Sequence, residues 1–437
     1  MSIPTLQGLQ TALSGLIASQ EAIDTTGHNI TNANTPGYSR QTAVLQTNTP
    51  LPIAAMSQLT GAGGQMGTGV NVTTFTRIRN TYLDAQYRTQ SASLGAASAE
   101  TNELQQAQSA FDEPSTSGIS SQLSAFWSAW GSLANSPSSE AAREGVISTG
   151  SQLATTLNQL SAQISTISEQ ATQQYASITG PTGQVQDAAN QIAQLNHQIQ
   201  LSEQAGEKPN DLLDRRDLLV DQLSELANVT VTQAANGSDT ISFGDAAQPL
   251  VEGSTVNWPQ ELTKAAGGQL GALLGVSDPE GQLASYQGAL NEVAGMLAGS
   301  VNALHTSTPF FTGNTAASIS VALTPAEVQT SSTAAPGGND VAQAIAALRG
   351  GTADSRYAGL IAQVGSDVQT AQDNQTTSQA VVSAIGNQRQ SVSGVSLDEE
   401  MTNLISFQRG YEASARTLTA MDEMLDTLIN HTGAVGL

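Results

Sequence analysis

The sequence predicts a mainly α fold, a long-helix bundle with paired N- and C-terminal coiled-coil helices and a small β-rich insertion. Three observations lead to this prediction. Apolar residues recur at alternating steps of three and four at both ends of the chain. Similar stripes, flanked by polar residues, fill most of the middle. Residues 228–278 interrupt these stripes with an alternating, turn-rich pattern that is typical of strands.

The first predicted helix lies at the start of the chain. Its stripe consists of Leu6, Leu9, Leu13, Leu16, Gln20, Ile23, Gly27 and Ile30. The helix should end near Asn32 to Asn34, because asparagine tolerates the left-handed backbone and Pro36 disfavours helical angles at the residue before it. Residues 36 to about 80 are predicted to be extended, with a flexible glycine-rich loop at 61–69 and a strand at 70–78.

The segment from about residue 82 to residue 227 is predicted to be helical. Two stripes carry this prediction, one running from Leu153 to Ala171 and one from Val185 to Ile199, and the sequence TGPTG at 179–183 marks a turn between them. A hairpin should follow, with Asn236 and Gly237 in its turn. Helical periodicity returns between residues 286 and 304 and again from about residue 339, after a connection with one possible strand, ISVAL.

The C-terminal stripe is the strongest signal in the chain. It consists of Leu397, Met401, Leu404, Gln408, Tyr411, Ala415, Leu418, Asp422, Leu425 and Ile429. Ser396 is predicted to cap this helix, with Glu399 in the capping-box position. We therefore predict three domains: an inner coiled-coil domain with an extended linker (1–80 with 395–437), a helical bundle (81–227 with 279–394) and an outward β-rich insertion (228–278).

Composition excludes several classes of function. The formal net charge is −23, with 14 basic and 37 acidic residues, so we expect no nucleic-acid partner and no anionic membrane partner. The chain has no cysteine, which removes disulfides and thiolate chemistry. It has no apolar run long enough for a membrane span. No basic residue precedes Arg40, so the N-terminus lacks the basic region of a cleavable signal peptide.

No constellation of residues predicts catalysis, a cofactor or a metal, and we expect no enzyme. The four histidines at 28, 197, 305 and 431 lie far apart in the sequence. Asp214, Asp217 and Asp221 could suggest a glycosidase pair, but no apolar cleft is predicted around them. We interpret them as a solvated helix face that forms local ion pairs with Arg215 and Arg216.

Both ends of the chain resemble known proteins. LQTALSGLIASQEAIDTTGHNITNANTPGYSRQ, at 9–41, resembles the N-terminal signature of flagellar axial proteins, which form the rod, hook and filament. GTGVNVTTFTRIRNTYLDAQYR (67–88), KPNDLLDRRDLLVDQLSEL (208–226) and the segment 393–430 resemble the hook-associated protein 1 family, the hook–filament junction subunits. GGQLGALLGVSD (267–278) and PFFTG (309–313) extend that resemblance over most of the chain.

The resemblance implies a structural subunit that self-assembles between hook and filament. It implies export through the flagellar type III apparatus to the extracellular flagellum. The implied partners are copies of the chain, hook protein, a second junction protein or flagellin, and an export chaperone at the C-terminal helix. Two alternatives remain open: another flagellar axial subunit, such as flagellin or the second junction protein, and a flagellum-borne adhesin or hydrolase with its activity at 228–340.

The expected subunit-interface residues combine the two stripes with the polar segment that follows the first helix. We interpret this segment as an assembly hinge rather than a catalytic loop. The predicted interface residues are Leu6, Leu9, Leu13, Leu16, Ile23, Asn29, Ile30, Asn32, Asn34, Pro36, Gly37, Tyr38, Leu397, Met401, Leu404, Tyr411, Leu418, Leu425 and Ile429.

Overall fold

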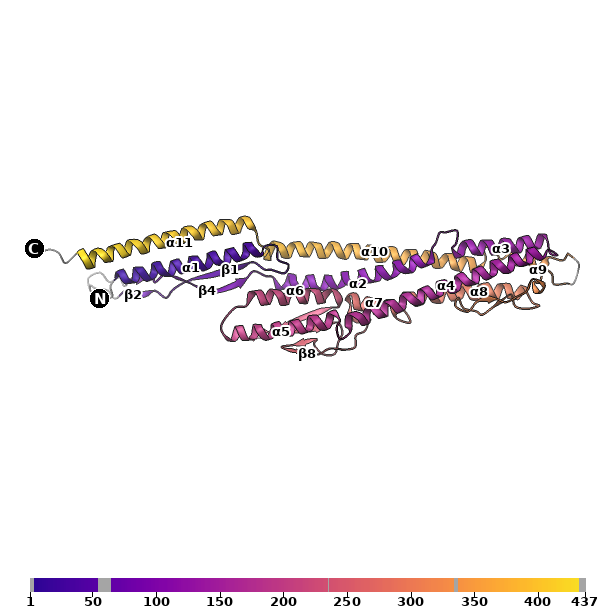
Figure 1. Ribbon diagram of the computed structural model, residues 1–437, viewed down its shortest axis with the longest axis horizontal. Helices are drawn as coiled ribbons and strands as arrows, with labels where there is room; N and C mark the ends of the chain where they lie inside the picture. Colours follow the sequence, from indigo (N-terminus) through magenta and orange to yellow (C-terminus); the bar gives the residue numbers. More distant parts are fainter. Residues whose placement is uncertain (1–3, 54–63, 235, 334–336, 432–437) are drawn as a thin grey trace, which may run out of the picture.

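The computed structural model describes residues 4–53, 64–234, 236–333 and 337–431. The chain forms an elongated rod of long helices with a small β part (Figure 1), which confirms the predicted fold class. The first and last helices, α1 (Pro4–Asn32) and α11 (Leu397–Asp426), lie side by side at one end of the rod. The predicted loop glycines 61–63 and the tail 432–437 lie outside the described residues.

A narrow β ribbon packs against the terminal helix pair. Its main strands, β1 (Gln41–Thr47) and β4 (Val70–Arg77), are antiparallel with a register shift between Val44 and Leu45. The short strands β2 (Leu51–Ile53) and β3 (Gly64–Met66) form a second antiparallel pair. Both β1 and β4 contact α1, so α1 lies between the ribbon and α11. The expected extended region after the first helix is therefore a paired ribbon.

Small residues set the spacing between α1 and α11. A Cβ atom on Gly15 would lie 3.0 Å from Ser414 Oγ, and a Cβ atom on Gly410 would lie 3.2 Å from Ser19 Oγ. The helices thus approach closely where side chains are shortest. The most deeply buried apolar residues of α1 are likewise alanines, Ala12, Ala18 and Ala22.

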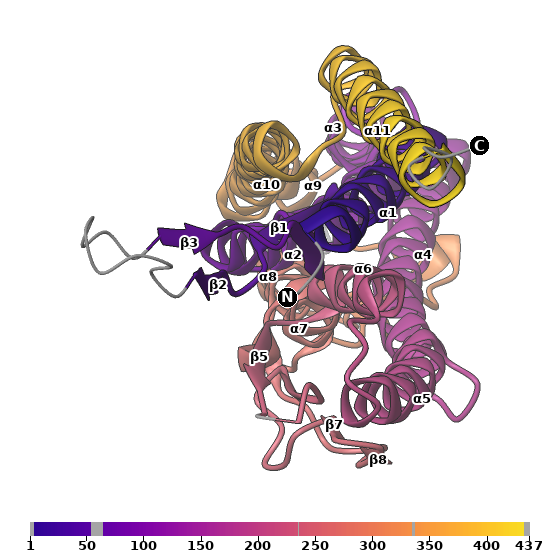
Figure 2. The same cartoon turned by 90° about the vertical axis from the view of Figure 1, so that its left-hand side faces the viewer.

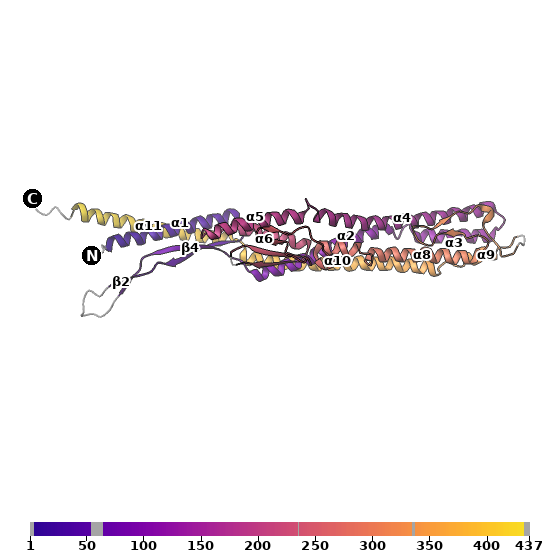
Figure 3. The same ribbon diagram turned by 90° about the horizontal axis from the view of Figure 1, so that it is seen from below.

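The middle and far end of the rod form the helical body. Here α2 (Thr81–Phe111) runs beside α10 (Thr352–Ser393), and α4 (Glu140–Thr179) crosses toward the far end (Figure 3). The far end also contains α3 (Ile119–Asn135), α8 (Gln282–Leu304), α9 (Asp340–Ala346), β9 (Phe311–Thr312) and β10 (Ser320–Val321). Its core is aromatic: Phe126, Trp130, Tyr286, Phe310 and Tyr357 are almost completely buried.

A second core joins the body to the β-rich part. It lies among α5 (Gln184–Gln204), α6 (Asn210–Leu226) and a four-stranded antiparallel sheet in the order β5 (Val229–Gln233), β6 (Asp239–Phe243), β7 (Val251–Glu252), β8 (Thr255–Val256). Viewed along the rod, this sheet and α5 lie on the side opposite to α11 (Figure 2).

Part of the expected insertion is helical rather than β-rich. Residues 268–277 form α7, which packs against α2. Leu270, Leu273 and Val276 recur every three residues and are buried, so the apolar GGQLGALLGVS run forms a short core helix. The predicted hairpin is present, with Gln233 opposite Asp239 across its turn. None of the described helices combines the length and hydropathy needed to span a membrane.

Gly95 provides a test of how tightly α2 fits against the body. A Cβ atom there would lie 2.0 Å from the backbone oxygen of Glu225 at the end of α6, whereas a Cβ atom on Gly145 in α4 would meet nothing within 4 Å. Gly95→Ala should lower the free energy of unfolding by about 2 kcal/mol because the overlap forces the backbone apart. Gly145→Ala should raise it by up to about 1 kcal/mol, because alanine is the better helix former.

Chemical denaturation of both variants, followed by circular dichroism, measures the two effects. Equal stabilisation by the two substitutions would show that α2 does not contact α6 as closely as described.

Candidate functional site

The polar segment after α1 forms a joint between the terminal helices and the helical body. Two backbone hydrogen bonds turn the chain, from Thr35 N–H to the Asn32 carbonyl at 2.9 Å and from Tyr38 N–H to the Thr35 carbonyl at 3.2 Å. Gly37 has a φ of +79°, and a Cβ atom on it would lie 3.1 Å from Leu218 Cβ of α6. Glycine suits this position because it adopts positive φ without strain and leaves room for α6.

Asn29 ties three elements together at the end of α1. Its Nδ2 donates to the Gln41 carbonyl at 2.8 Å and to Glu400 Oε2 at 3.0 Å. Its Oδ1 accepts from Gln41 N–H at 2.9 Å and from the Tyr38 hydroxyl at 2.8 Å. The amide is buried and uses all four of its hydrogen-bonding positions. Asn29, which we predicted at a subunit interface, therefore holds α1, β1 and α11 together within one chain.

Tyr38 and His28 extend this network toward α6. The Tyr38 hydroxyl lies 3.0 Å from His28 Nδ1, and His28 Nε2 lies 3.6 Å from Asp211 Oδ2. Burial raises the pKa of Tyr38 above its usual range, and the nearby carboxylates of Asp211, Asp214 and Glu400 raise it further. Tyr38 therefore remains a neutral hydrogen-bond donor. Among the other predicted hinge residues, Asn32 donates to the His28 carbonyl, while Asn34, Pro36 and Gly37 are exposed.

Arg40 links the joint to the start of α11. Its Nε donates to Glu400 Oε1 at 2.7 Å, and its Nη1 donates to Glu399 Oε2 at 2.8 Å. Ser396 caps α11 as predicted, accepting from Glu399 N–H at 3.5 Å. The Glu399 carboxylate turns to Arg40, so an ion pair replaces the return half of the predicted capping box. The Glu400 side chain is only 2% exposed, and its charge is balanced by Arg40.

The acidic face of α6 receives the other side of the joint. Ser39 donates to Asp214 through both its backbone N–H and its hydroxyl, each at 2.8 Å. Gln41 Nε2 donates to Asp211 Oδ1 at 2.8 Å. Asp214 is buried, so our interpretation of these aspartates as a solvated face is wrong. The local basic neighbours are not their partners: Arg215 is exposed, and Arg216 turns to Asp239 at 2.9 Å.

Four arginines from distant parts of the chain neutralise this face. They come from the end of β4, from the connection to α2, from α2 and from α10. The closest contacts are Arg77 to Asp214 at 2.7 Å, Arg79 to Asp217 at 2.9 Å, Arg88 to Asp221 at 2.7 Å and Arg389 to Asp221 at 2.8 Å. We call these three aspartates of α6 and four arginines the arginine–aspartate cluster: Asp214, Asp217, Asp221, Arg77, Arg79, Arg88 and Arg389.

Asp217 is the central carboxylate of the cluster. Burial alone would raise its pKa, but the guanidinium groups of Arg79, Arg77 and Arg88 outweigh burial and hold the pKa below its ordinary value. The side chains involved are mostly buried, at 14% exposure for Asp217, 11% for Arg79 and 9% for Arg88. These pairs are consequently much less screened by salt than surface ion pairs.

The predicted stripe residues divide into two sets. Leu9, Leu16, Ile23 and Ile30 of α1 and Leu404, Leu418 and Leu425 of α11 are half-buried. Exposed residues are Leu6, Leu13, Leu397, Met401, Tyr411 and Ile429, joined by Ile17 and Ile405, which the stripe prediction missed. With about 3.6 residues per turn, Leu13 lies on the side of α1 opposite to the buried Ala22. One apolar edge of each terminal helix is therefore left uncovered in the single chain.

His305 lies in the aromatic core and not at the joint. His305 is buried beside the aromatic core, where its Nε2 accepts from Gln329 N–H at 2.8 Å and burial lowers its pKa. Within the described ranges, no group of three or more histidine, aspartate or glutamate side chains is arranged to hold a metal ion.

The cluster predicts a pH-dependent stability contribution. Asp217→Asn should lower the free energy of unfolding at pH 7 by about 3 kcal/mol, because it leaves buried arginines without their partner. Because the folded pKa of Asp217 is depressed, this contribution is fully present above its ordinary value of 3.8 and is lost as the pH falls through the folded pKa. Urea denaturation of wild type and variant between pH 2 and pH 7 measures the difference.

Asp211→Asn is the matched control, since Asp211 lies on the same helix and its side chain is 63% exposed. It should change stability by less than about 0.5 kcal/mol. Equal losses in the two variants would contradict a special role for the buried cluster.

Three segments of the chain match known protein families, one at each end and one in the middle. Residues 104–264 match the flagellar hook-associated protein FlgK helical domain. Residues 9–38 match the flagella basal body rod protein family, and residues 387–431 match the flagellar basal body rod FlgEFG protein C-terminal family. The two terminal matches cover most of α1 and all of α11, which pair in space.

Two proteins align with nearly the whole chain, and one solved structure aligns with about half of it. Flagellar hook-associated protein 1 of Bacillus subtilis is 29% identical over 507 aligned residues, covering 99% of this chain and 99% of the relative. The Escherichia coli protein of the same name is 27% identical, covering 97% and 99%. The flagellar hook junction protein FlgK from Burkholderia pseudomallei aligns structurally with a TM-score of 0.44 and 28% identity, covering 52% of this chain and 44% of that one. The chain thus contains a match to the FlgK helical domain and is similar over nearly its whole length to proteins named flagellar hook-associated protein 1, which indicates a structural protein of the hook–filament junction.

Proposed function

We propose that this chain self-assembles through the exposed apolar edges of α1 and α11 to build the junction between hook and filament. The observation that carries the proposal is the row of uncovered apolar side chains on the pair of terminal helices. Leu6, Leu13 and Ile17 on α1 and Met401 and Ile405 on α11 are each 43–52% exposed. Burying such surface stabilises an assembly by roughly 25 cal/mol per Å². All of the predicted interface residues on the stripes belong to this proposal.

The proposed domain division follows the rod from inside to outside. Residues 1–80 with 395–437 are the inner coiled-coil domain, and residues 81–227 with 279–394 are the helical bundle. Residues 228–278 are the outward insertion, with α7 as its helical inner edge. The arginine–aspartate cluster joins the first two of these domains. The joint residues Asn34, Pro36 and Gly37 are exposed and are proposed to contact neighbouring subunits, whereas Asn29 and Tyr38 hold the joint together from inside.

A junction protein works outside the cell, on the flagellum and in contact with other axial subunits. We propose copies of the chain, hook protein, and either a second junction protein or flagellin as these subunits. Export through the flagellar type III apparatus and a chaperone bound to the C-terminal helix complete the proposal. The net charge of −23 supports partners other than nucleic acid or an anionic membrane.

Met401→Asp tests self-assembly. In a strain that lacks the chromosomal copy, this variant should give hooks without filaments in electron micrographs, because a charge would enter the apolar contact between copies. The control is a separate single variant, Ser406→Asp, which adds the same charge at an exposed polar position on a different face of α11. This variant should produce filaments as the wild-type chain does. Normal filaments with Met401→Asp, or hooks without filaments with both variants, would refute the proposed contact.

The chaperone proposal has a separate test. Deletion of residues 397–430 should abolish co-purification of the chain with the flagellar export chaperone, since the apolar stripe of α11 would be gone. The full-length chain carrying Ser406→Asp should still co-purify with it. Retention of the chaperone by the truncated chain would move the binding site elsewhere.

A further inference from the structure

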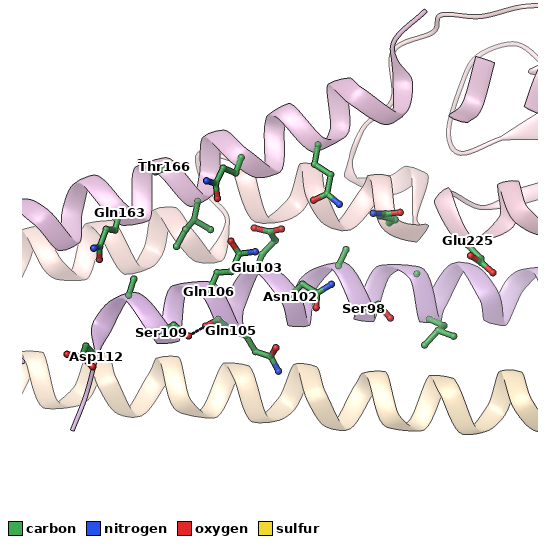
Figure 4. Close-up of a pocket in the computed structure, with 18 of the residues that line it drawn as sticks. Ser98, Asn102, Glu103, Gln105, Gln106, Ser109, Asp112, Gln163, Thr166 and Glu225 are labelled. Carbon is green, nitrogen blue, oxygen red and sulfur yellow. Dashed lines mark hydrogen bonds between the residues drawn. The ribbon is translucent and has the colours of Figure 1, made fainter. Parts of the chain in front are cut away.

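A polar groove lies between α2 and α4, away from the joint and from the exposed edges of α1 and α11. Its volume is about 1210 Å³, and α6 and α7 contribute Glu225 and Gln269 at one end. Eleven of its 19 lining residues carry amide or hydroxyl side chains, among them Asn102, Gln106, Gln163 and Thr166. None of the described residues that line the groove is basic. Figure 4 shows Asn102, Glu103 and Gln106 of α2 beside Gln163 and Thr166 of α4.

Glu103 is the unusual member of this lining. The residue is 4% exposed, and its Oε2 atom is buried without any hydrogen-bond partner. In Figure 4 its side chain extends from α2 into the space toward α4. Burial raises the pKa of this carboxyl above its ordinary value. A second lining residue, Ser91, is 2% exposed, and its Oγ likewise lacks a partner. Buried polar atoms without partners are rare in folded proteins because desolvation is costly.

The carboxyl groups of the groove follow its length. Asp112 lies at the C-terminal end of α2, Glu103 near the middle, and Glu225 beside Gly95 at the other end. At about 1.5 Å rise per residue, Asp112 lies about 13.5 Å from Glu103 along α2, and Gly95, which marks the Glu225 end, lies about 12 Å from it. The groove therefore has a line of separated negative charges joined by amide oxygens.

The chemistry of this lining excludes most classes of ligand. Anions would meet three acids and no base. Sugars usually stack on aromatic rings, and the groove has none. A divalent metal needs six or more oxygens within about 2.6 Å, but the acids are spread along the helix. An extended organic cation with several ammonium groups satisfies all of these conditions.

We propose that the groove binds a linear polyamine, with one ammonium group held by Glu103 and its neighbour Gln106 and another by Ser91, toward the Glu225 end of the groove. The amide oxygens between the acids accept from the other ammonium groups, and the acids at the ends of the groove attract the chain of charges. This site goes beyond the proposed junction function and does not depend on it: its residues form none of the hydrogen bonds described for the joint and lie outside the exposed apolar edges, and only Glu225 also lines the pocket beside the joint.

Titration of the full-length monomer with spermidine tests the proposal. Isothermal calorimetry should show saturable binding to wild type, and Glu103→Gln should weaken it about tenfold or more, because it removes a charge-assisted hydrogen bond. Glu144→Gln on α4 makes the same charge change at an exposed site outside the groove and should bind as wild type does.

Proton release gives a second readout. An ammonium group beside Glu103 favours the ionised carboxyl, so binding should release protons, and the binding enthalpy should depend on the buffer in wild type only. Spermidine binding that is unchanged in Glu103→Gln would overturn the proposal. A calorimetric signal that sodium chloride reproduces at matched ionic strength would also overturn it. The same holds if Glu103→Gln changes self-association but leaves spermidine binding unchanged.

Discussion

Ion pairing on the acidic face of α6 is the contact on which the architecture depends. Four arginines from β4, the following connection, α2 and α10 converge there with Ser39 and Gln41 of the joint. Buried ion pairs add little net stability, because desolvation offsets most of the attraction, yet removing one partner is costly. The cluster therefore contributes mainly to the specificity of the fold. Every buried charge in it is compensated only when all of these segments come together in this arrangement.

Much of the chain's positive charge is used inside the joint and the cluster, which leaves the rest of the surface acidic. The chain has 14 basic residues and a net charge of −23. Arg40, Arg77, Arg79, Arg88, Arg216 and Arg389 all pair with acids inside this region. The outside is consequently strongly acidic, which keeps free copies apart. The association of copies that we propose through the apolar edges of α1 and α11 would have to overcome this repulsion.

Helices and their ends could be predicted from sequence because their causes are local. Pro36 and Ser396 mark boundaries, and apolar periodicity marks buried faces. The aspartates of α6 were misread because their partners are more than a hundred residues away, and no local rule connects Asp214 with Arg77. Likewise, periodicity identifies an apolar stripe without saying what covers it. The close approach of α1 and α11 uses Gly15 and Gly410 instead, leaving several stripe residues outside. The helix at 268–277, inside the expected β-rich insertion, was not predicted because a short apolar run suits strand or helix.

Ser39, Arg40 and Gln41 bind alternately to two different helices, Ser39 and Gln41 to α6 and Arg40 to α11. This follows from extended backbone, in which successive side chains point to opposite sides. Twisting the terminal pair about the rod axis would have to stretch the bonds on both sides of this strand at once. The hydrogen bonds of these three residues therefore resist rotation of the terminal helix pair relative to α6 in either direction.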